Sequence, residues 1–308
     1  MGTVMTLQGE IRGEDLGVVD YHEHLCIRPP RWLLREDPDF ALDDVEKSTA
    51  ELRTWARAGG RSLIEMSAID FGRDIRAVRR IARKVPEVNV IAITGFNKPY
   101  YCDDAVFAAP DKDLIKRCLR DISRGIDGTD CKAGLVKGGT GYNTMNERDC
   151  KLLRVAAQVH LESGVPLITH TEAGTMGFEQ IEFLVACGVE PSRVCLSHMD
   201  RNPDFWEHRR IAATGAYLGY DCAGKIKYGP DEIRIEVLKR LVEAGLGSQI
   251  LLGNDLGRPS YWRHYGGGPG LDFVLEKFVP RLRQEGLGAA VLEDILVHNP
   301  RRYLTGEM

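Results

Sequence analysis

The sequence predicts an α/β fold, a (β/α)8 barrel of the TIM type with metal-binding residues at the carboxyl ends of its strands. Eight short apolar runs alternate with longer segments whose apolar residues recur every three or four positions, which is typical of repeated βα units. Several of these runs end on a histidine, lysine or aspartate. Because 308 residues suffice for one such barrel, we expect a single domain over residues 1–308.

The expected strands are short and follow one another along the whole chain. They cover residues 16–21, 62–67, 89–95, 133–137, 165–169, 193–197, 215–219 and 249–253. Eight parallel strands are the number that closes a barrel of this kind. Between them, helical spacing of apolar residues predicts an outer ring of helices over 42–58, 74–84, 113–124, 147–162, 178–187 and 231–244.

Two longer segments show neither the apolar runs of the expected strands nor the helical spacing of apolar residues. Residues 28–39 are rich in proline, arginine and tryptophan, and residues 257–270 are rich in glycine. Both follow strand ends that carry possible metal ligands. We therefore expect these two segments to be loops that cover the site.

Composition narrows the class of partner. The net charge of −4 gives no electrostatic reason to bind nucleic acid, and no apolar run is long enough to cross a membrane. Eight cysteines lack the spacing of a zinc knuckle or redox motif, and the first residues lack a secretory signal. We expect a cytoplasmic protein with reduced thiols and a small-molecule partner, without nucleic acid or membrane binding.

Six side chains that can bind metal lie at the carboxyl ends of five expected strands. His22 and His24 are one residue apart, so on a strand their side chains point to the same face. The others are Lys137, His170, His198 and Asp255. Strand ends of a parallel barrel converge on one face, which favours a shared site over isolated structural histidines. Four imidazoles, a carboxylate and a lysine suit two divalent ions better than one tetrahedral zinc.

Lys137 requires a separate explanation, because an ammonium group would be repelled by two cations. A neutral amine that has captured carbon dioxide becomes a carbamate, an anion that can bridge both metals, and nearby cations favour that form. The alternative is a solvated or salt-bridged lysine at the top of a strand. The glycine-rich segment that follows, residues 138–143, suits close backbone approach to a ligand and favours the carbamate.

The chain resembles the phosphotriesterase family of the amidohydrolase superfamily. The matching segments occur in the family's order over nearly the whole chain, and they are Tyr21-His22-Glu23-His24-Leu25, Phe71-Gly72-Arg73-Asp74, Ala133-Gly134-Leu135-Val136-Lys137, Thr169-His170-Thr171-Glu172, Ser197-His198-Met199-Asp200-Arg201 and Gly253-Asn254-Asp255. A departure from many relatives lies at Glu65-Met66, for which the sequence offers no functional interpretation.

The resemblance implies a binuclear centre with defined ligands. By position, His22, His24 and Asp255 would hold the more buried ion. His170 and His198 would hold the more exposed one, and carboxylated Lys137 (N6-carboxylysine) and a hydroxide would bridge the two. The hydroxide would attack the substrate while Asp255 accepts its proton. We expect zinc, with manganese or cobalt as alternatives, and the resemblance also favours a homodimer.

Residues in the loops after three of the expected strands indicate an anionic, polar substrate. Cations there would bind a phosphate or carboxylate, and tyrosines would add hydroxyl groups and stacking area. The candidate substrate-binding residues are Lys98, Tyr100, Lys225, Lys227, Tyr228, Arg258 and Tyr261. The alternative is that they are ordinary solvated residues at the rim.

The pattern over residues 225–231, with the downstream arginine-tyrosine loop, is similar to a branch of the family that hydrolyses phosphorylated sugar lactones. We therefore expect a metal-dependent lactonase that acts on a phosphorylated sugar 1,4-lactone. The alternatives are a phosphotriesterase or N-acyl amide hydrolase with the same metals, and a non-catalytic protein that binds sugar phosphates.

Overall fold

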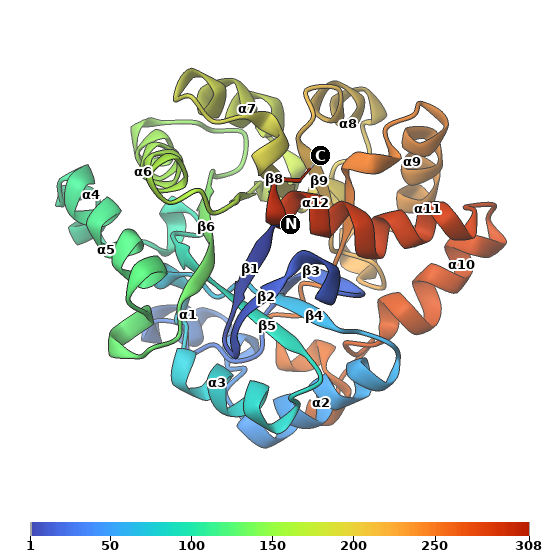
Figure 1. The fold of residues 1–308 in the computed structure, drawn as a ribbon, viewed down its shortest axis with the longest axis horizontal. Coiled ribbons are helices and arrows are strands. Elements are labelled where there is room, and N and C mark those ends of the chain that lie inside the picture. Colours follow the sequence, from blue (N-terminus) through green and yellow to red (C-terminus); the bar gives the residue numbers. More distant parts are fainter. Residues whose placement is uncertain (1, 308) are drawn as a thin grey trace.

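The computed structural model describes residues 2–307 and contains the expected eight-stranded parallel barrel (Figure 1). The strands pair in sequence order from β3 to β10, which confirms the predicted fold class. Their bounds are β3 (Val19–Glu23), β4 (Ser62–Glu65), β5 (Asn89–Gly95), β6 (Ala133–Gly139), β7 (Leu167–His170), β8 (Val194–Ser197), β9 (Tyr217–Tyr220) and β10 (Ile250–Leu252).

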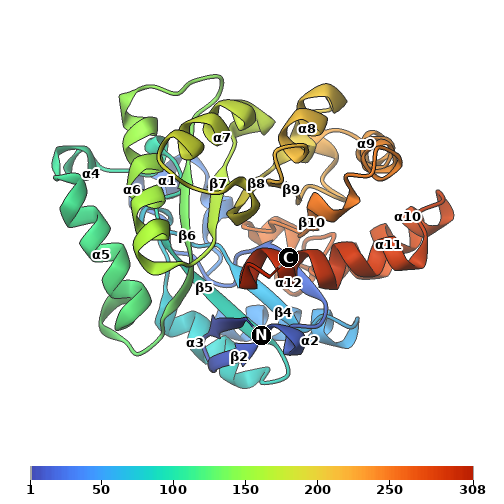
Figure 2. The ribbon, with the colours of Figure 1, turned by 45° about the horizontal axis from the view of Figure 1, so that its top comes forward.

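Helices surround these strands, and Figure 2 shows α6 to α9 following one another around the outside. The predicted helices correspond to α2 (Val45–Arg57), α3 (Ile75–Lys84), α5 (Asp111–Ser123), α6 (Glu147–Ser163), α7 (Gly177–Ala186) and α9 (Asp231–Glu243). Further helices are α1 (Arg31–Glu36), α4 (Asp104–Ala108), α8 (Phe205–Ala212), α10 (Val279–Gln284), α11 (Ala289–Glu293) and α12 (Asn299–Thr305). No helix within residues 2–307 has the length and apolar character needed to traverse a bilayer.

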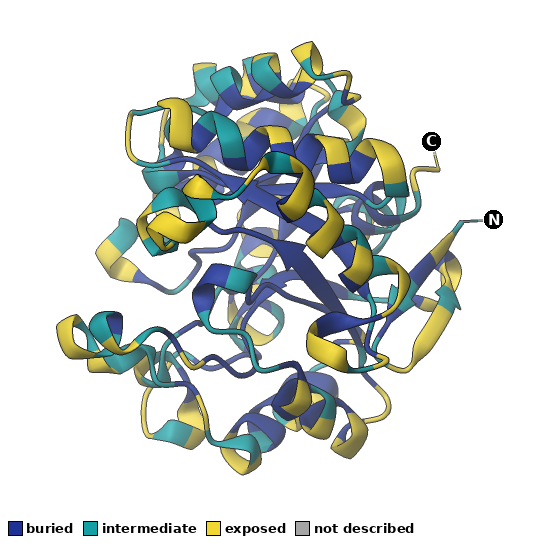
Figure 3. Ribbon diagram, turned by 90° about the vertical axis from the view of Figure 1, so that its left-hand side faces the viewer, coloured by how far each residue is buried: buried dark blue, intermediate teal, exposed yellow. Residues whose placement is uncertain are grey.

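The capping of the helices follows local chemistry. Asp44 precedes α2 and accepts hydrogen bonds from the Glu46 and Lys47 main-chain N–H groups at 3.0 and 3.1 Å. Gly164 ends α6 with a φ of 76°, a left-handed conformation that glycine adopts without steric cost. In Figure 3 the barrel strands are buried and the helices expose their outer faces, as expected of a ring around a sheet.

Apolar side chains fill the barrel from its amino-terminal end. Ile64, Ile91, Leu135 and Ile168 point inward from four successive strands into one buried cluster. An N-terminal hairpin, β1 (Thr3–Thr6) with β2 (Gly9–Arg12), adds Val4 to this cluster and was not predicted. Because apolar side chains fill the amino-terminal end of the barrel, the polar side chains are concentrated at the opposite, carboxyl-terminal end.

The first and last barrel strands meet above this core. The Asp255 main-chain N–H donates to the His22 carbonyl oxygen at 2.9 Å, which links the ends of β3 and β10. A Cβ atom on Gly253 would lie 2.7 Å from Asp20 Oδ1 and 2.9 Å from the His22 nitrogen, so only glycine allows this close approach.

The two long segments meet over the carboxyl-terminal end, although the first is not wholly a loop, because residues 31–36 within it form α1. The Arg258 guanidinium donates to the Asp37 carboxylate at 2.5 Å. The Ser260 main-chain N–H donates to Asp39 Oδ1 at 3.0 Å. These contacts tie residues 257–270 to residues 28–39 beside the cavity described next.

Candidate metal centre

His22 and His24 project from the end of β3 toward the carboxylate of Asp255. The Nε2 atoms of His22 and His24 lie 3.7 and 3.6 Å from Asp255 Oδ1. Two ligand atoms each about 2.1 Å from a tetrahedral zinc ion are separated by about 3.4 Å. The three side chains therefore fit one divalent ion, and their donor atoms all lie within 4.8 Å of one another.

Two cations hold the other oxygen of the same aspartate. Arg201 Nη2 and Lys225 Nζ lie 3.0 and 3.2 Å from Asp255 Oδ2. Burial opposes ionisation of Asp255, but Lys225 and the neighbouring histidines and Arg201 outweigh it and hold its pKa well below the usual range. The carboxylate is thus ionised, with Oδ1 directed at the histidines.

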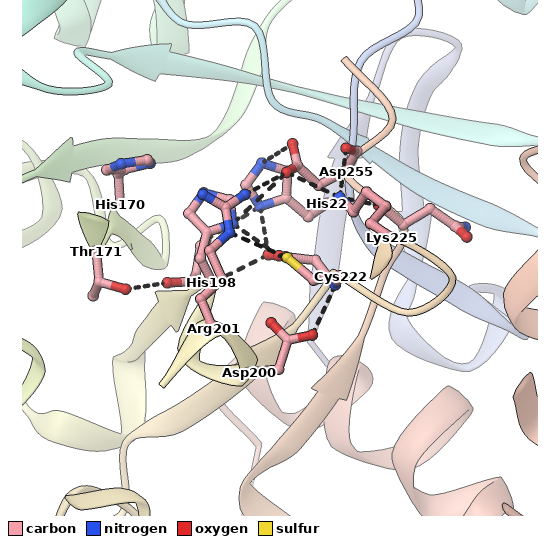
Figure 4. Close-up of polar contacts among 12 residues, drawn as sticks. His22, His170, Thr171, His198, Asp200, Arg201, Cys222, Lys225 and Asp255 are labelled. Atoms are coloured by element: carbon pink, nitrogen blue, oxygen red, sulfur yellow. Dashed lines mark hydrogen bonds and ion pairs between the residues drawn. The ribbon is translucent and has the colours of Figure 1, made fainter. Parts of the chain in front are cut away.

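The other three predicted ligands line the same cavity as His22, His24 and Asp255, which has a volume of about 190 Å³. Lys137 lies on β6 and is 1% exposed, and burial lowers the pKa of its amine to about 8. The ring of His198 lies 4.7 Å from that of His170 and 4.9 Å from that of His22, measured between centroids. The structure therefore brings all six side chains, from the carboxyl-terminal parts of five strands, to one cavity. Figure 4 labels His22, His170, His198 and Asp255.

In three of the imidazoles, the ring nitrogen Nδ1 contacts a neighbouring side chain that orients the ring. His22 Nδ1 lies 3.2 Å from Ser197 Oγ, His24 Nδ1 lies 3.0 Å from Ser67 Oγ, and His198 Nδ1 lies 2.8 Å from Asp221 Oδ1. In each ring the Nδ1 atom is engaged, so Nε2 remains for a metal. Such partners fix the tautomer and the ring direction of metal-binding histidines.

The sequence interpretation missed these partners. Asp221 directly follows β9, so the strand-end signal that singled out Asp255 also applied to it. It lies fully buried and also accepts hydrogen bonds from the Tyr21 hydroxyl and the His198 main-chain N–H. Glu65, at the departure from the family pattern, accepts the Ser67 hydroxyl at 2.5 Å and so supports His24 through Ser67. No sequence pattern predicts this chain of contacts from Glu65 through Ser67 to His24.

The predicted substrate-binding residues separate into two groups. Lys98, Tyr228, Arg258 and Tyr261 line the cavity. Tyr100, Lys225 and Lys227 are outside its lining.

Each residue of the second group has another environment. Tyr100 is 58% exposed and donates to Glu36, and exposed Lys227 lies 4.9 Å from the Tyr261 ring centroid. Lys225 is buried, and its ammonium donates to the carbonyl oxygens of Asn254 and Asp255, both at 2.8 Å.

Four further polar residues in the lining were not predicted as substrate contacts. They are Asn97, Tyr101, Glu172 and Arg201. The Arg201 guanidinium lies 4.2 Å from the Tyr228 ring centroid and donates to Asp255, so it connects the wall of the cavity to a candidate metal ligand.

Comparison with known proteins agrees with this geometry. The model of the Phosphotriesterase family matches residues 2–304. A phospho-furanose lactonase of Mycoplasmopsis synoviae is 33% identical over 97% of this chain and 90% of its own length. The crystal structure of a lactonase from Listeria monocytogenes has a TM-score of 0.94 at 33% identity and covers 99% of this chain and 100% of its own.

A second solved structure contains an anion. The phosphotriesterase homology protein from Escherichia coli, complexed with phosphate in its active site, has a TM-score of 0.90 at 32% identity. The match covers 94% of this chain and 99% of that one.

The buried Asp221 carboxylate provides a direct test of the second partners. We expect Asp221→Ala to weaken divalent-metal binding by roughly 10- to 100-fold, because His198 loses the acceptor that fixes its ring. Metal titration of the metal-free protein by calorimetry measures this. Asp103→Ala, at an exposed position, serves as the control, and unaltered affinity in Asp221→Ala would contradict the assignment.

Proposed function

Because the chain belongs to the phosphotriesterase family, we propose that it is a metal-dependent hydrolase that opens a phosphorylated sugar 1,4-lactone. One observation carries the proposal. The cavity that holds six metal-capable side chains is also lined by Arg258, Tyr228 and Tyr261. A cation and two phenols beside the reacting centre suit an anionic sugar derivative, and related proteins are named phospho-furanose lactonases.

His22, His24 and Asp255 would hold one ion, His170 and His198 the other, and carboxylated Lys137 would connect them. The observed distances from Asp255 Oδ1 to two histidines and the burial of Lys137 support this set. Two divalent ions there would supply a water-derived nucleophile at neutral pH and polarise the lactone carbonyl.

Asp255 is the proposed proton acceptor. It is ionised, and Arg201 and Lys225 fix its carboxylate while Oδ1 stays directed into the centre. When the ring opens, the same carboxyl group can return the proton to the alkoxide that leaves the carbonyl carbon. Main-chain hydrogen bonding to His22 keeps Asp255 in place during these transfers.

Arg258 is the proposed phosphate contact. Its guanidinium has five donors, of which Nη1 is engaged by Asp37, and its face lies 3.9 Å from the Phe40 ring centroid. A planar donor held on an aromatic ring is suited to bidentate phosphate binding. A neutral organophosphate or long acyl chain would require an apolar lining instead, so the phosphotriesterase and amide hydrolase alternatives are less well supported.

We further propose zinc as the metal, a homodimer as the assembly and the cytoplasm as the location. The nitrogen and oxygen donor set suits zinc, and also manganese or cobalt. Dimers are the commonest assembly of soluble proteins.

Initial hydrolysis rates on matched sugar 1,4-lactones, with and without a terminal phosphate, test the proposed substrate. We expect the wild-type protein to prefer the phosphorylated member, and Arg258→Met to lose roughly 10- to 100-fold in kcat/KM on that member alone, as expected for about 1.5–3 kcal/mol from a charged hydrogen bond. Proton release measures the rate. A preference for the unphosphorylated member would refute the phosphate assignment.

The role of Asp255 is tested by Asp255→Asn. We expect kcat to fall by roughly 100-fold or more at saturating metal, because an amide cannot accept the proton. Metal content is measured on the same samples by elemental analysis. Undiminished hydrolysis with both ions bound would show that another group takes the proton.

The carbamate is tested by comparing Lys137→Glu with Lys137→Met. Glutamate supplies a carboxylate in place of the carbamate, so we expect it to retain more bound metal than methionine does. In the wild-type protein, NMR after exchange into ¹³C-bicarbonate should show a carbamate signal that is missing from both variants. Full metal binding by Lys137→Met would contradict the assignment.

A further inference from the structure

His170 differs from the other three histidines of the centre in the atom that a second partner engages. Its Nε2 atom lies 3.0 Å from Glu172 Oε2, whereas the other rings are engaged at Nδ1. A proton on Nε2 that is donated to this carboxylate leaves the lone pair on Nδ1. His170 would therefore present Nδ1 to a metal, and Glu172 determines this choice.

The backbone around Glu172 holds the carboxylate in this position. The Glu172 carbonyl oxygen accepts hydrogen bonds from the Thr175 main-chain N–H at 3.1 Å and the Thr175 hydroxyl at 2.7 Å. Ala173, between them, has a φ of 55°, which is unusual for a residue with a side chain. This tight turn directs Glu172 back toward the end of β7.

His170 is fixed in the same way on its main-chain side. Its carbonyl oxygen accepts from the Thr140 main-chain N–H at 3.1 Å and from Gln180 Nε2 at 3.0 Å. Both partners of the His170–Glu172 contact thus have restricted positions, so the contact is a defined feature of the site.

Lys98 forms an ion pair with the same Glu172 oxygen that faces His170. The Lys98 side chain is 13% exposed, and its ammonium lies 5.0 Å from the Tyr101 ring centroid. The positive charge of Lys98 is therefore already opposed by a carboxylate within the cavity wall. Lys98 and Arg258 line the same cavity. The partner of Lys98, Glu172, lies beside the candidate ligand His170, whereas the partner of Arg258, Asp37, lies in the segment 28–39 that covers the site.

We propose that Glu172 is a positioning residue that aims His170 Nδ1 at the more exposed ion, and that Lys98 holds Glu172 in place rather than binding the substrate phosphate. This inference rests on the proposed binuclear hydrolase. It assigns the Lys98–Glu172 pair to the metal side of the cavity and leaves Arg258 as the anion contact.

Cobalt titration of the metal-free protein, followed by calorimetry and visible absorbance, tests the inference without measuring turnover. We expect two ions in the wild-type protein and an affinity for the second ion that is roughly 10- to 100-fold weaker in Glu172→Ala, with the first ion unaffected. Glu172→Gln should retain most of this affinity, because its amide oxygen still accepts from His170 Nε2. Lys98→Met should lose less than Glu172→Ala.

Glu46→Ala is the matched control, because it removes the Glu46–Lys84 surface ion pair without touching the cavity. On the matched lactones, Lys98→Met should lower kcat equally for both members. Arg258→Met should selectively reduce the rate on the phosphorylated member.

Three results would overturn the inference. They are wild-type affinity for the second ion in Glu172→Ala, equal weakening of both ions in that variant, and a selective loss on the phosphorylated lactone in Lys98→Met. A wild-type protein that binds a single ion would instead refute the proposed binuclear centre, and the inference with it.

Discussion

Closure of the barrel between its first and last strands is the constraint on which the rest of the site depends. The Asp255 main-chain hydrogen bond to His22 joins residues that are 233 positions apart in the sequence. It brings the carboxylate of one strand end to the imidazoles of the other, at 3.6 and 3.7 Å. Glycine at position 253 permits this approach, so a backbone requirement in the barrel directly sets the geometry of the centre.

Around the contact between β3 and β10, buried charged and polar side chains pair with one another. Asp255 is balanced by Arg201 and Lys225, and His198 by Asp221. Burial without such partners would cost several kcal/mol for an ionised group, of order 1–3 kcal/mol for a neutral one. The partners also hold the rings and the carboxylate in fixed directions, so the same contacts that make burial tolerable orient the candidate ligands.

The cations near the centre differ in which carboxylate each one pairs with. Lys225 and Arg201 bind Asp255, and Lys98 binds Glu172, so all three charges are opposed close to the candidate ligands. Arg258 instead pairs with Asp37 of the covering loop and lies on Phe40. A positive charge in the wall of such a cavity therefore does not by itself identify a substrate contact, because its carboxylate partner decides what it can do.

The sequence by itself determined the barrel and the set of six strand-end side chains. Periodicity encodes both, since a strand end in a parallel barrel faces the common end of the molecule whatever the other strands contain. The N-terminal hairpin was not predicted, because β2 is largely exposed and neither of its strands contains an apolar run, whereas the equally short barrel strands are buried and apolar.

Only the tertiary structure decided which side chains meet across the barrel. Ser67 and Ser197 reach histidines 43 and 175 residues away, and the sequence contains no local sign of either contact. Lys225 and Arg258 follow neighbouring strand ends and have similar local sequences of cations and tyrosines, yet one is buried against Asp255 and the other lines the cavity. The environments of Lys225 and Arg258 differ because segments distant in the sequence supply their carboxylate partners. These segments come together only when the barrel closes.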